Sequence, residues 1–313
     1  MESNGDDRKT TTYCVTGANG DIGSWLVKFL LERGYIVHAT LRDLGNERLI
    51  LFRADLQDDG SFDGALKGCD GVFHGVRYLT KSQYVQSKVV DPAIKAVRNV
   101  LGSCLLSKSV KRVVFTSSIS SLKAKDENER WRSIVDQICK TPIDHIYVQS
   151  KLVSEEEAFR YAKERGLDLV SVIRTTVSGP FLTPSLSSSL QVLLYPITGA
   201  CVFVYDILSG VNKRMGSIGL AHIQDICMAH LFLMEEPKSE GQYICCVDSI
   251  DMHDLMLINF CKDQSLIKAY VFFKKKLREL RFEYRYGIEE IIHPTIDASI
   301  SFRFPTLNHK LKQ

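Results

Sequence analysis

The sequence lacks the features that would place the chain in a membrane or in an oxidising compartment. No apolar run approaches the roughly 18 residues that a transmembrane helix needs, so no membrane span is expected. The nine cysteines include no Cys-x-x-C pair, the usual spacing of zinc and redox motifs. Residues 1–12 are polar and lack the apolar core of a signal peptide. We therefore expect a cytoplasmic protein without a bound metal, in which cysteines in apolar surroundings are small core residues, namely Cys14, Cys69, Cys104 and Cys227.

Signals for large partners are also absent. The formal net charge is only +3, and no basic run is dense enough to predict binding to nucleic acid. There is no internal repeat and no low-complexity linker. A chain of 313 residues with 45% hydrophobic residues suits one large core, with a small appended lobe. We expect a monomer or a homodimer whose partner is a small molecule.

The sequence does contain a strand, a glycine-rich turn and a helix near its start. Residues 13–16 form a short β-type run, residues 22–30 carry apolar side chains at helical spacing, and residues 35–41 form a second β-type run. The turn after the first run contains Gly17, Gly20 and Gly23. Such a turn brings backbone N–H groups and the positive end of a helix dipole to a pyrophosphate. The stretch therefore predicts a βαβ unit that binds a dinucleotide.

Each glycine has its own predicted role. Gly17 allows a tight turn, Gly20 lets the phosphates approach, and Gly23 lets the helix pack on the strand. The neighbours expected at the same cofactor site are Asn19, Asp21 and Ile22.

The end of the second strand should select the cofactor. An acidic residue about 20 positions past the glycines usually holds the ribose hydroxyls of NAD, whereas an arginine matches the 2′-phosphate of NADP. Arg42 and Asp43 are adjacent here, and both compete for that role.

The connection to the next strand, expected at 49–52, is unusually short. Only residues 43–48 lie between the two strands, whereas parallel neighbours need a crossover of about a dozen residues or more. The sequence leaves two alternatives: a truncated crossover, or an antiparallel hairpin through residues 44–46. A truncated crossover should remove the apolar cover from one sheet face, near Val37, Ala39 and Leu51.

Strands and helices then alternate as far as residue 180. Further strands are expected at 71–76, 112–116 and 167–173, and helices at 61–67, 84–107 and 146–165. Ser61 is a candidate N-cap, and Pro92 should bend the long helix. The alternation predicts an α/β fold with a doubly wound parallel sheet, a Rossmann fold, over residues 1–180. The irregular remainder, 181–313, is expected to be a small C-terminal substrate lobe whose strands and helices return to the core.

Candidate catalytic residues follow from position in this fold. Ser118 lies at the end of the strand at 112–116, the sheet edge where ligands bind. Tyr147 and Lys151 are four apart and share a helix face, so the ammonium group should lower the pKa of the phenol. The tyrosine could then protonate a carbonyl oxygen that the serine holds while a nicotinamide delivers hydride. Two other Tyr-x-x-x-Lys pairs, at 84 and 270, do not follow a serine-bearing strand.

With these residues the chain resembles the extended short-chain dehydrogenase/reductases of the NAD(P)-binding Rossmann superfamily. It is most similar to the plant dihydroflavonol 4-reductase, anthocyanidin reductase and cinnamoyl-CoA reductase group. The motifs that carry the resemblance include Val15-Thr16-Gly17-x-x-Gly20-x-x-Gly23, Arg42-Asp43, Ala54-Asp55-Leu56, Thr116-Ser117-Ser118, Tyr147/Lys151, Gly179-Pro180 and His222-x-x-Asp225 with His230.

The resemblance implies an NADPH-dependent reductase that acts on a carbonyl or related group of a phenylpropanoid or flavonoid-like aromatic metabolite. It implies a catalytic triad of Ser118, Tyr147 and Lys151. It implies cofactor contacts from Arg42 at the 2′-phosphate, from Asp55 with Leu56 near the adenine, and from Pro180 and Ser189 at the nicotinamide end. For His222, Asp225 and His230 a structural role in bracing the lobe is favoured over a chemical one.

Departures from the family pattern leave a second interpretation open. The helix between the second and third strands is almost absent, and the segment before Tyr147 is several residues short. Arg77 adds a bulky cation to a loop that faces the cofactor. Leu122-Lys123 occupies the region where the family has a polar Asn or Asp that helps to read flavonoid hydroxyls. Arg281 occupies a position where glycine is usual. Dihydroflavonol is therefore a poor candidate substrate, and the alternative is a truncated relative that keeps the fold without turnover.

Overall fold

The structure is a computed structural model. It describes residues 11–41, 49–75, 86–122, 134–135, 146–182, 189–191, 193–194, 209, 211–212, 215–251, 255, 272–273 and 276–301. Some of the residues named above lie outside this part of the chain, or their side chains do, so the predictions about them are not tested. They are Arg42, Asp43, Arg77, Lys123 and the Tyr-x-x-x-Lys pairs at 84 and 270.

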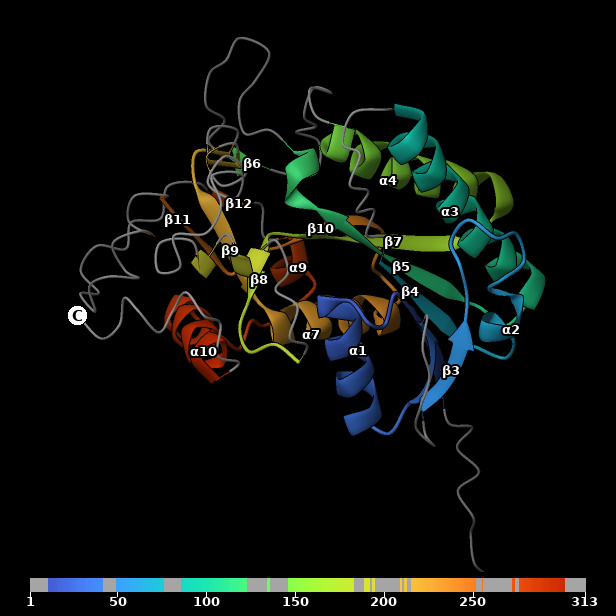
Figure 1. Cartoon of the computed structure of the whole chain (residues 1–313), viewed down its shortest axis with the longest axis horizontal. Coiled ribbons are helices and arrows are strands. Elements are labelled where there is room, and N and C mark those ends of the chain that lie inside the picture. The colour runs from blue at the N-terminus through green and yellow to red at the C-terminus, as the bar shows by residue number, and fades with distance from the viewer. Residues whose placement is uncertain are drawn as a thin grey trace, which may run out of the picture.

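A seven-stranded parallel sheet forms the centre of the molecule (Figure 1). Its strands are β1 (Thr12–Thr16), β2 (Ile36–Leu41), β3 (Leu49–Arg53), β4 (Gly71–Gly75), β5 (Arg112–Ser118), β7 (Asp168–Arg174) and β10 (Gly241–Cys245). The strand order is β10-β7-β5-β4-β1-β2-β3, and all six neighbouring pairs are parallel. The chain builds outward from β1 in both directions, which confirms the predicted doubly wound sheet.

Helices cover both faces of this sheet (Figure 1). One face carries α1 (Asp21–Glu32) and α7 (Ile223–Glu235), and the other carries α2 (Asp63–Leu66), α3 (Gln86–Ser107) and α4 (Ile146–Arg165). Alternate residues of a strand face opposite sides, so Val114 packs with α1 and α7 whereas Val113 packs with α3 and α4. Among the described helices, none is both long enough and apolar enough to cross a membrane.

The four cysteines predicted to be core residues are indeed buried. Cys14, Cys69 and Cys104 lie in the core under α3 and α4, and Cys227 lies in the core under α1 and α7. All four are free thiols.

The structure decides between the two alternatives for the short connection. β2 pairs with β3 in parallel, from Val37 opposite Leu49 to Leu41 opposite Arg53, so the antiparallel hairpin is wrong and the crossover is truncated. The expected loss of apolar cover is also wrong for Val37 and Ala39, which are both 0% exposed. These two residues lie in the core that α1 contributes to. The missing helix leaves only the edge strand β3 less covered, where Leu49 and Leu51 are half-buried.

Two local predictions concern Pro92 and Ser61. Pro92 lies inside α3, which continues on both sides of it, and the bend expected there stays a prediction. Ser61 is not the N-cap of α2, because Phe62 occupies that position and makes no side-chain capping bond. The Ser61 hydroxyl instead donates to the carbonyl of Asp55 at 2.6 Å and accepts from its backbone N–H at 3.2 Å. The Ser61 hydroxyl therefore bonds the backbone of Asp55, six residues earlier, and does not cap α2.

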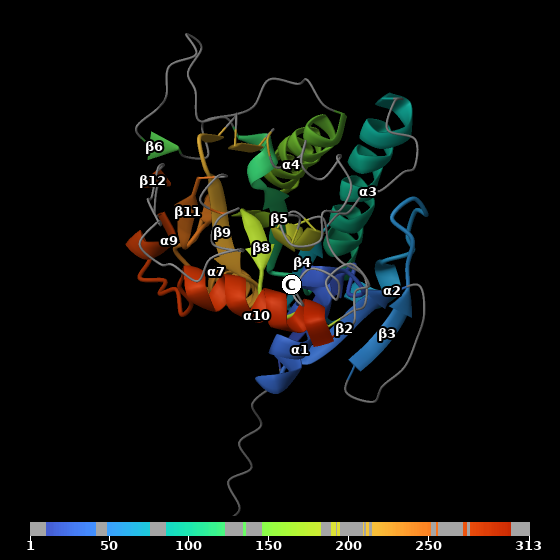
Figure 2. The same ribbon diagram turned by 60° about the vertical axis from the view of Figure 1, so that its left-hand side comes forward.

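The C-terminal part adds a second, smaller sheet. It contains β8 (Thr176–Ser178), β9 (Ile218–His222) and β11 (Asp248–Ile250) in the order β11-β9-β8. The helix α10 (Ile288–Ser301) lies beside β8 and β9 (Figure 2). β10 returns to the main sheet beside β7. A short pair, β6 (Ile134–Val135) with β12 (Phe272–Phe273), lies farther out.

Arg281 shows why glycine suits its position. It follows α9 (Lys276–Glu279) with a φ of 69°, in the left-handed region. Its N–H donates to the carbonyl of Arg278, and the next N–H, of Phe282, donates to the carbonyl of Leu277. This is a Schellman ending, in which the left-handed residue is usually glycine. An arginine there carries a conformational cost of about 1–2 kcal/mol.

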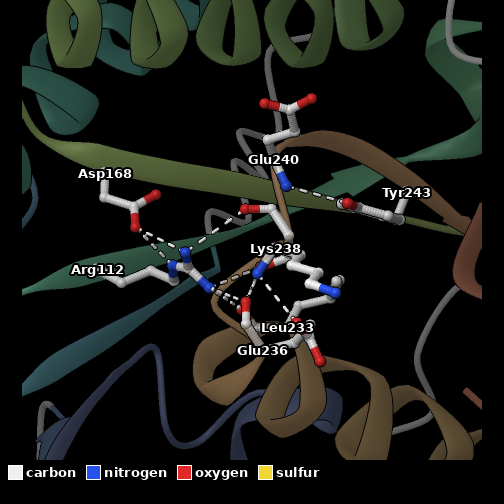
Figure 3. A network of polar contacts seen from close by, with 8 residues as sticks. Arg112, Asp168, Leu233, Glu236, Lys238, Glu240 and Tyr243 are labelled. Atoms are coloured by element: carbon white, nitrogen blue, oxygen red, sulfur yellow. Dashed lines mark hydrogen bonds and ion pairs between the residues drawn. The ribbon is translucent and has the colours of Figure 1, made fainter. Parts of the chain in front are cut away.

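A buried arginine at the N-terminal end of β5 joins this strand to β7 and to the end of α7 (Figure 3). Arg112 at the start of β5 is 9% exposed, and its guanidinium donates to the carboxylate of Asp168 at 2.8 Å. Its Nη1 also donates to the carbonyls of Leu233 and Glu236 and to the hydroxyl of Ser239, at 2.8, 2.6 and 2.6 Å. These carbonyls lie at the C-terminal end of α7, where backbone acceptors lack helical partners and the dipole favours a cation.

Replacing Arg112 should therefore destabilise the whole domain. We expect Arg112→Met to lower the free energy of unfolding by about 2–4 kcal/mol, because several buried acceptors lose a charged donor. Urea denaturation would measure the change. The matched control is Lys111→Met, since Lys111 is 79% exposed and pairs with Asp70 at 3.3 Å. It should cost less than about 1 kcal/mol. Equal losses in the two variants would contradict a special role for Arg112.

Candidate active site

The glycine turn after β1 has the geometry that its sequence predicts. Gly17 has a φ of 64°, which favours glycine. A Cβ at Gly23 would overlap the carbonyl oxygen of Gly17 and lie 2.9 Å from the Cα of Ala18. The structural roles predicted for Gly17 and Gly23 are therefore confirmed: one allows the turn and the other lets α1 approach β1.

The N-terminus of α1 has no side-chain cap. Gly20 is the N-cap and provides no side-chain hydrogen bond, and a Cβ on it would come within 3.2 Å of the Gly17 carbonyl. Asn19 is exposed, and Asp21 and Ile22 are half-buried around the first turn. A helix N-terminus capped by glycine presents backbone N–H groups that fit a dinucleotide pyrophosphate.

The residues predicted at the adenine end lie just after β3. The carboxylate of Asp55 is exposed and accepts from the N–H of Gln57 at 2.9 Å, while Ser61 holds its backbone. The carbonyl of Leu56 accepts from the side chain of Asn99 in α3 at 3.0 Å. These contacts hold the turn in one position beside the end of β2, where Arg42 would follow.

The predicted catalytic residues are carried by elements that pack together. Ser118 is the last residue of β5 and is 6% exposed; its Oγ lies 2.9 Å from the Oγ of Ser120. Lys151 lies in α4 and is 7% exposed. Tyr147 lies in the first turn of the same helix, and its side chain is outside the described part. Because α4 packs against β5 and the short turn Ile119–Ser121, all three backbone positions belong to one region.

A histidine that the sequence argument left without a role lies beside this region. The Nδ1 atom of His74 is 2.8 Å from the hydroxyl of Thr16, which also accepts from the N–H of Gly75 at 3.3 Å. The tautomer of the imidazole decides whether Nδ1 accepts from this hydroxyl or donates to it. Burial, and then the charge of Lys151, lower the pKa of His74 to about 3. The ring is neutral at physiological pH, and within the described residues its Nε2 has no hydrogen-bond partner.

The residues predicted at the nicotinamide end follow β7. Pro180 comes after Gly179, whose φ is 122° and whose Cβ, if present, would lie 2.7 Å from the Nε2 of His222. Ser189 accepts a hydrogen bond from the Nη1 of Arg174 at 3.3 Å. Arg174 was not among the predicted site residues, although a charged residue at the end of a buried strand was a signal for it.

The structural role expected for three polar residues of the lobe is confirmed. The carboxylate of Asp225 accepts from the backbone N–H groups of Arg285 and Tyr286, at 2.9 and 3.3 Å. The rings of His222 and Tyr286 stack with centroids 3.8 Å apart. His230 donates from Nδ1 to the carbonyl of Ile226 at 2.7 Å, and its Nε2 lies 2.9 Å from the hydroxyl of Thr116 in β5. These side chains join segments of the fold.

No metal site is evident in the part of the chain that the structure describes. There, no group of three or more His, Cys, Asp or Glu side chains is arranged to hold a metal ion.

A parallel sheet with a glycine turn after its first strand, and with Ser118 and the helix of Lys151 at the same edge, defines a dinucleotide-binding enzyme fold. Residues 13–246 match the NAD dependent epimerase/dehydratase family, and the chain belongs to this family.

Individual relatives agree with this assignment. A Ginkgo biloba protein with the provisional name anthocyanidin reductase is 38% identical over 92% of this chain and 94% of its own length. The dihydroflavonol 4-reductase of Arabidopsis thaliana is 35% identical over 92% of this chain and 82% of its own length. Vestitone reductase from alfalfa superimposes with a TM-score of 0.74, at 25% identity, over 93% of this chain and 98% of that chain. The resemblance to extended short-chain reductases of this plant group is confirmed.

The buried histidines predict how stability depends on pH. Burial lowers the pKa of His74 to about 3 and the pKa values of His222 and His230 to about 4. In the unfolded chain they would bind protons below about pH 6.5, so the unfolded state binds more protons between pH 6.5 and 4. The free energy of unfolding should therefore fall as the pH drops through this window, by about 1–2 kcal/mol per histidine at pH 5.

Urea denaturation at pH 7, 6 and 5 would test this dependence. In His230→Gln the free energy of unfolding should fall less steeply as the pH drops. The contribution of one histidine is missing, because the unfolded state has one proton-binding group fewer. The control is His293→Gln, at an exposed position, which should keep the slope of the native chain. An unchanged slope in the His230 variant would show that this histidine does not contribute.

Proposed function

We propose that the protein is an NADPH-dependent oxidoreductase of the dihydroflavonol, anthocyanidin and cinnamoyl-CoA reductase type. It reduces a carbonyl or related group of an aromatic, phenylpropanoid or flavonoid-like metabolite. The observation that carries this proposal is the position of Ser118 and Lys151 on adjoining elements, at the sheet edge that also bears the glycine turn. The named activities of the dihydroflavonol reductase and vestitone reductase relatives support it.

The chain's own residues supply the remaining parts of the reaction. The Ser118 hydroxyl holds the carbonyl oxygen, and Tyr147 donates the proton that this oxygen gains. Lys151, one helical turn from Tyr147, stabilises the ionised phenol. The neutral ring of His74 lies near Lys151 without adding a second positive charge to the site. NADPH, when bound, would provide the hydride.

The cofactor fits the backbone cradle at α1 already described. Gly17, Gly20 and Gly23, with Asn19, Asp21 and Ile22, would hold the pyrophosphate. Asp55 and Leu56 would lie at the adenine, Arg42 at the 2′-phosphate, and Pro180 and Ser189 at the nicotinamide end. In this proposal residues 1–180 form the cofactor-binding core, and residues 181–313 form the substrate lobe that returns to it. We place the enzyme in the cytoplasm, because the buried cysteines of the described part are free thiols. We propose a monomer or a homodimer.

A second candidate is a relative that keeps the fold without turnover. The truncated crossover between β2 and β3 favours it, since residues 42–48 both replace a helix and border the adenosine end. The burial of Val37 and Ala39 argues against a large loss of stability from this truncation. Fluorescence titration with NADPH separates the two candidates, because a reductase requires binding at micromolar concentrations of the cofactor.

Tyr147→Phe should abolish reductase activity while the fold is retained. Phenylalanine keeps the aromatic ring but lacks the hydroxyl that donates the proton, so kcat should fall by about 10²-fold or more. The measurement is NADPH oxidation with an aromatic aldehyde, together with a thermal melt. Tyr84→Phe removes a phenol from another Tyr-x-x-x-Lys pair and is the matched control. Inactivation by the Tyr84 change instead would reassign the proton donor.

Arg42→Ala should reduce the preference for NADPH over NADH. A guanidinium can bind a phosphate with two hydrogen bonds, and NADH carries no 2′-phosphate. We expect the affinity for NADPH to fall by about tenfold or more and the affinity for NADH to change little. Titrations of both cofactors would show it, with Asp43→Ala as the neighbouring control. An unchanged NADPH/NADH ratio in Arg42→Ala would remove this residue from the site.

A further inference from the structure

Arg174 is a half-buried cation whose charge is not neutralised by the described part of the chain. It ends β7, and its hydrogen-bond partner is the neutral hydroxyl of Ser189, 3.3 Å from Nη1. No carboxylate of the described residues forms an ion pair with it. Asp225, the buried carboxylate of α7, is instead engaged by the N–H groups of Arg285 and Tyr286. A partly desolvated guanidinium without a counter-ion is costly, so its retention calls for an anionic partner.

The strand register places Arg174 beside the catalytic serine. Arg174 is the Cα partner of Ser118 across the β5–β7 pair. Two residues earlier in both strands, Thr116 is the partner of Val172. Both side chains face α7: Thr116 contacts His230 of this helix, and Val172 lies in the core that the helix covers. Because side chains alternate along parallel strands, Ser118 and Arg174 project on this same side. The charge of Arg174 also contributes to lowering the pKa of His230, behind burial as the main cause.

The cofactor phosphates are too far away to be the anion. The pyrophosphate cradle follows β1, and β4 and β5 separate β1 from β7 in the sheet. Three strand spacings amount to about 14 Å. The 2′-phosphate would lie beyond β2, farther still in the same direction. The nicotinamide ring of the reduced cofactor carries no negative charge. Of the two molecules that the proposed reaction brings to this site, the substrate is therefore the one that can place an anion at Arg174.

We propose that Arg174, together with Ser189, binds a carboxylate of the substrate, so that the enzyme acts on aromatic carbonyl compounds that carry an acidic group. This inference deepens the proposed reductase function and rests on it for the location of the substrate. The guanidinium presents two parallel N–H groups that match a carboxylate, and Ser189 orients Nη1. With the acid held by Arg174, the reducible group of the same molecule lies over Ser118. Arg174 thereby selects among aromatic substrates by charge.

Calorimetric titration with cinnamate and cinnamamide tests the proposal. The two ligands have the same shape and differ in charge. In the presence of NADP⁺, the native protein should bind cinnamate at least about tenfold more tightly than cinnamamide. In Arg174→Gln the affinity ratio should fall to about one, and Arg174→Lys should retain part of it. The control is Arg165→Gln, because Arg165 is exposed on α4 and stacks on Tyr161, 5.2 Å from the ring centroid.

Three results would overturn the assignment of Arg174. They are equal affinities of the native protein for the two ligands, a preference that persists in Arg174→Gln, and no cinnamate binding at millimolar concentration. A circular dichroism melt of Arg174→Gln and Arg174→Lys confirms that both variants are folded. The titration is repeated without nucleotide, and NADPH oxidation is measured separately with 4-carboxybenzaldehyde. Carboxylate binding that depends on Arg174, without any NADPH oxidation, would support this site and refute the reductase function.

Discussion

The close contact between Gly23 and the carbonyl of Gly17 determines how near α1 lies to β1. Because no Cβ intervenes, the helix packs directly on the first strand. Its apolar residues, with Leu30 fully buried, then join the core under the sheet, in which Val37 and Ala39 are also covered. The same approach leaves the N-terminus of α1 uncapped at the sheet edge. One steric condition thus produces both a filled core and a helix end whose backbone N–H groups suit the proposed pyrophosphate site.

The two ends of the sheet use buried polar groups differently. At the N-terminal end of β5, Arg112 is surrounded by acceptors from β7 and the end of α7, so its charge is compensated within the protein. At the C-terminal ends of the strands, His74 and Arg174 are less completely paired within the described part of the chain. The first arrangement stabilises the fold, and the second leaves polar atoms available to ligands. This difference is what separates a structural network from a candidate active site.

Two buried histidines form hydrogen bonds between different elements of the fold. His230 in α7 contacts Thr116 in β5, and His74 in β4 contacts Thr16 in β1. Each threonine provides a local partner for a ring that burial keeps neutral, so the site contains imidazole without its charge. Among the described residues near Ser118, the positive charges are those of Lys151 and Arg174. In the proposed reductase these two charges have separate tasks, one acting on the phenol of Tyr147 and the other on the substrate.

The sequence by itself determined the main strands and helices of residues 1–180 and the order in which they occur. Periodicity and glycine spacing are local properties, and they sufficed for the doubly wound sheet, the glycine turn and the placement of Ser118 and Lys151. They did not decide the parallel pairing of β2 with β3, the role of Ser61 or the position of Arg174 beside Ser118. Those depend on register and packing between segments far apart in the chain, which the tertiary structure alone specifies because many distant contacts form together.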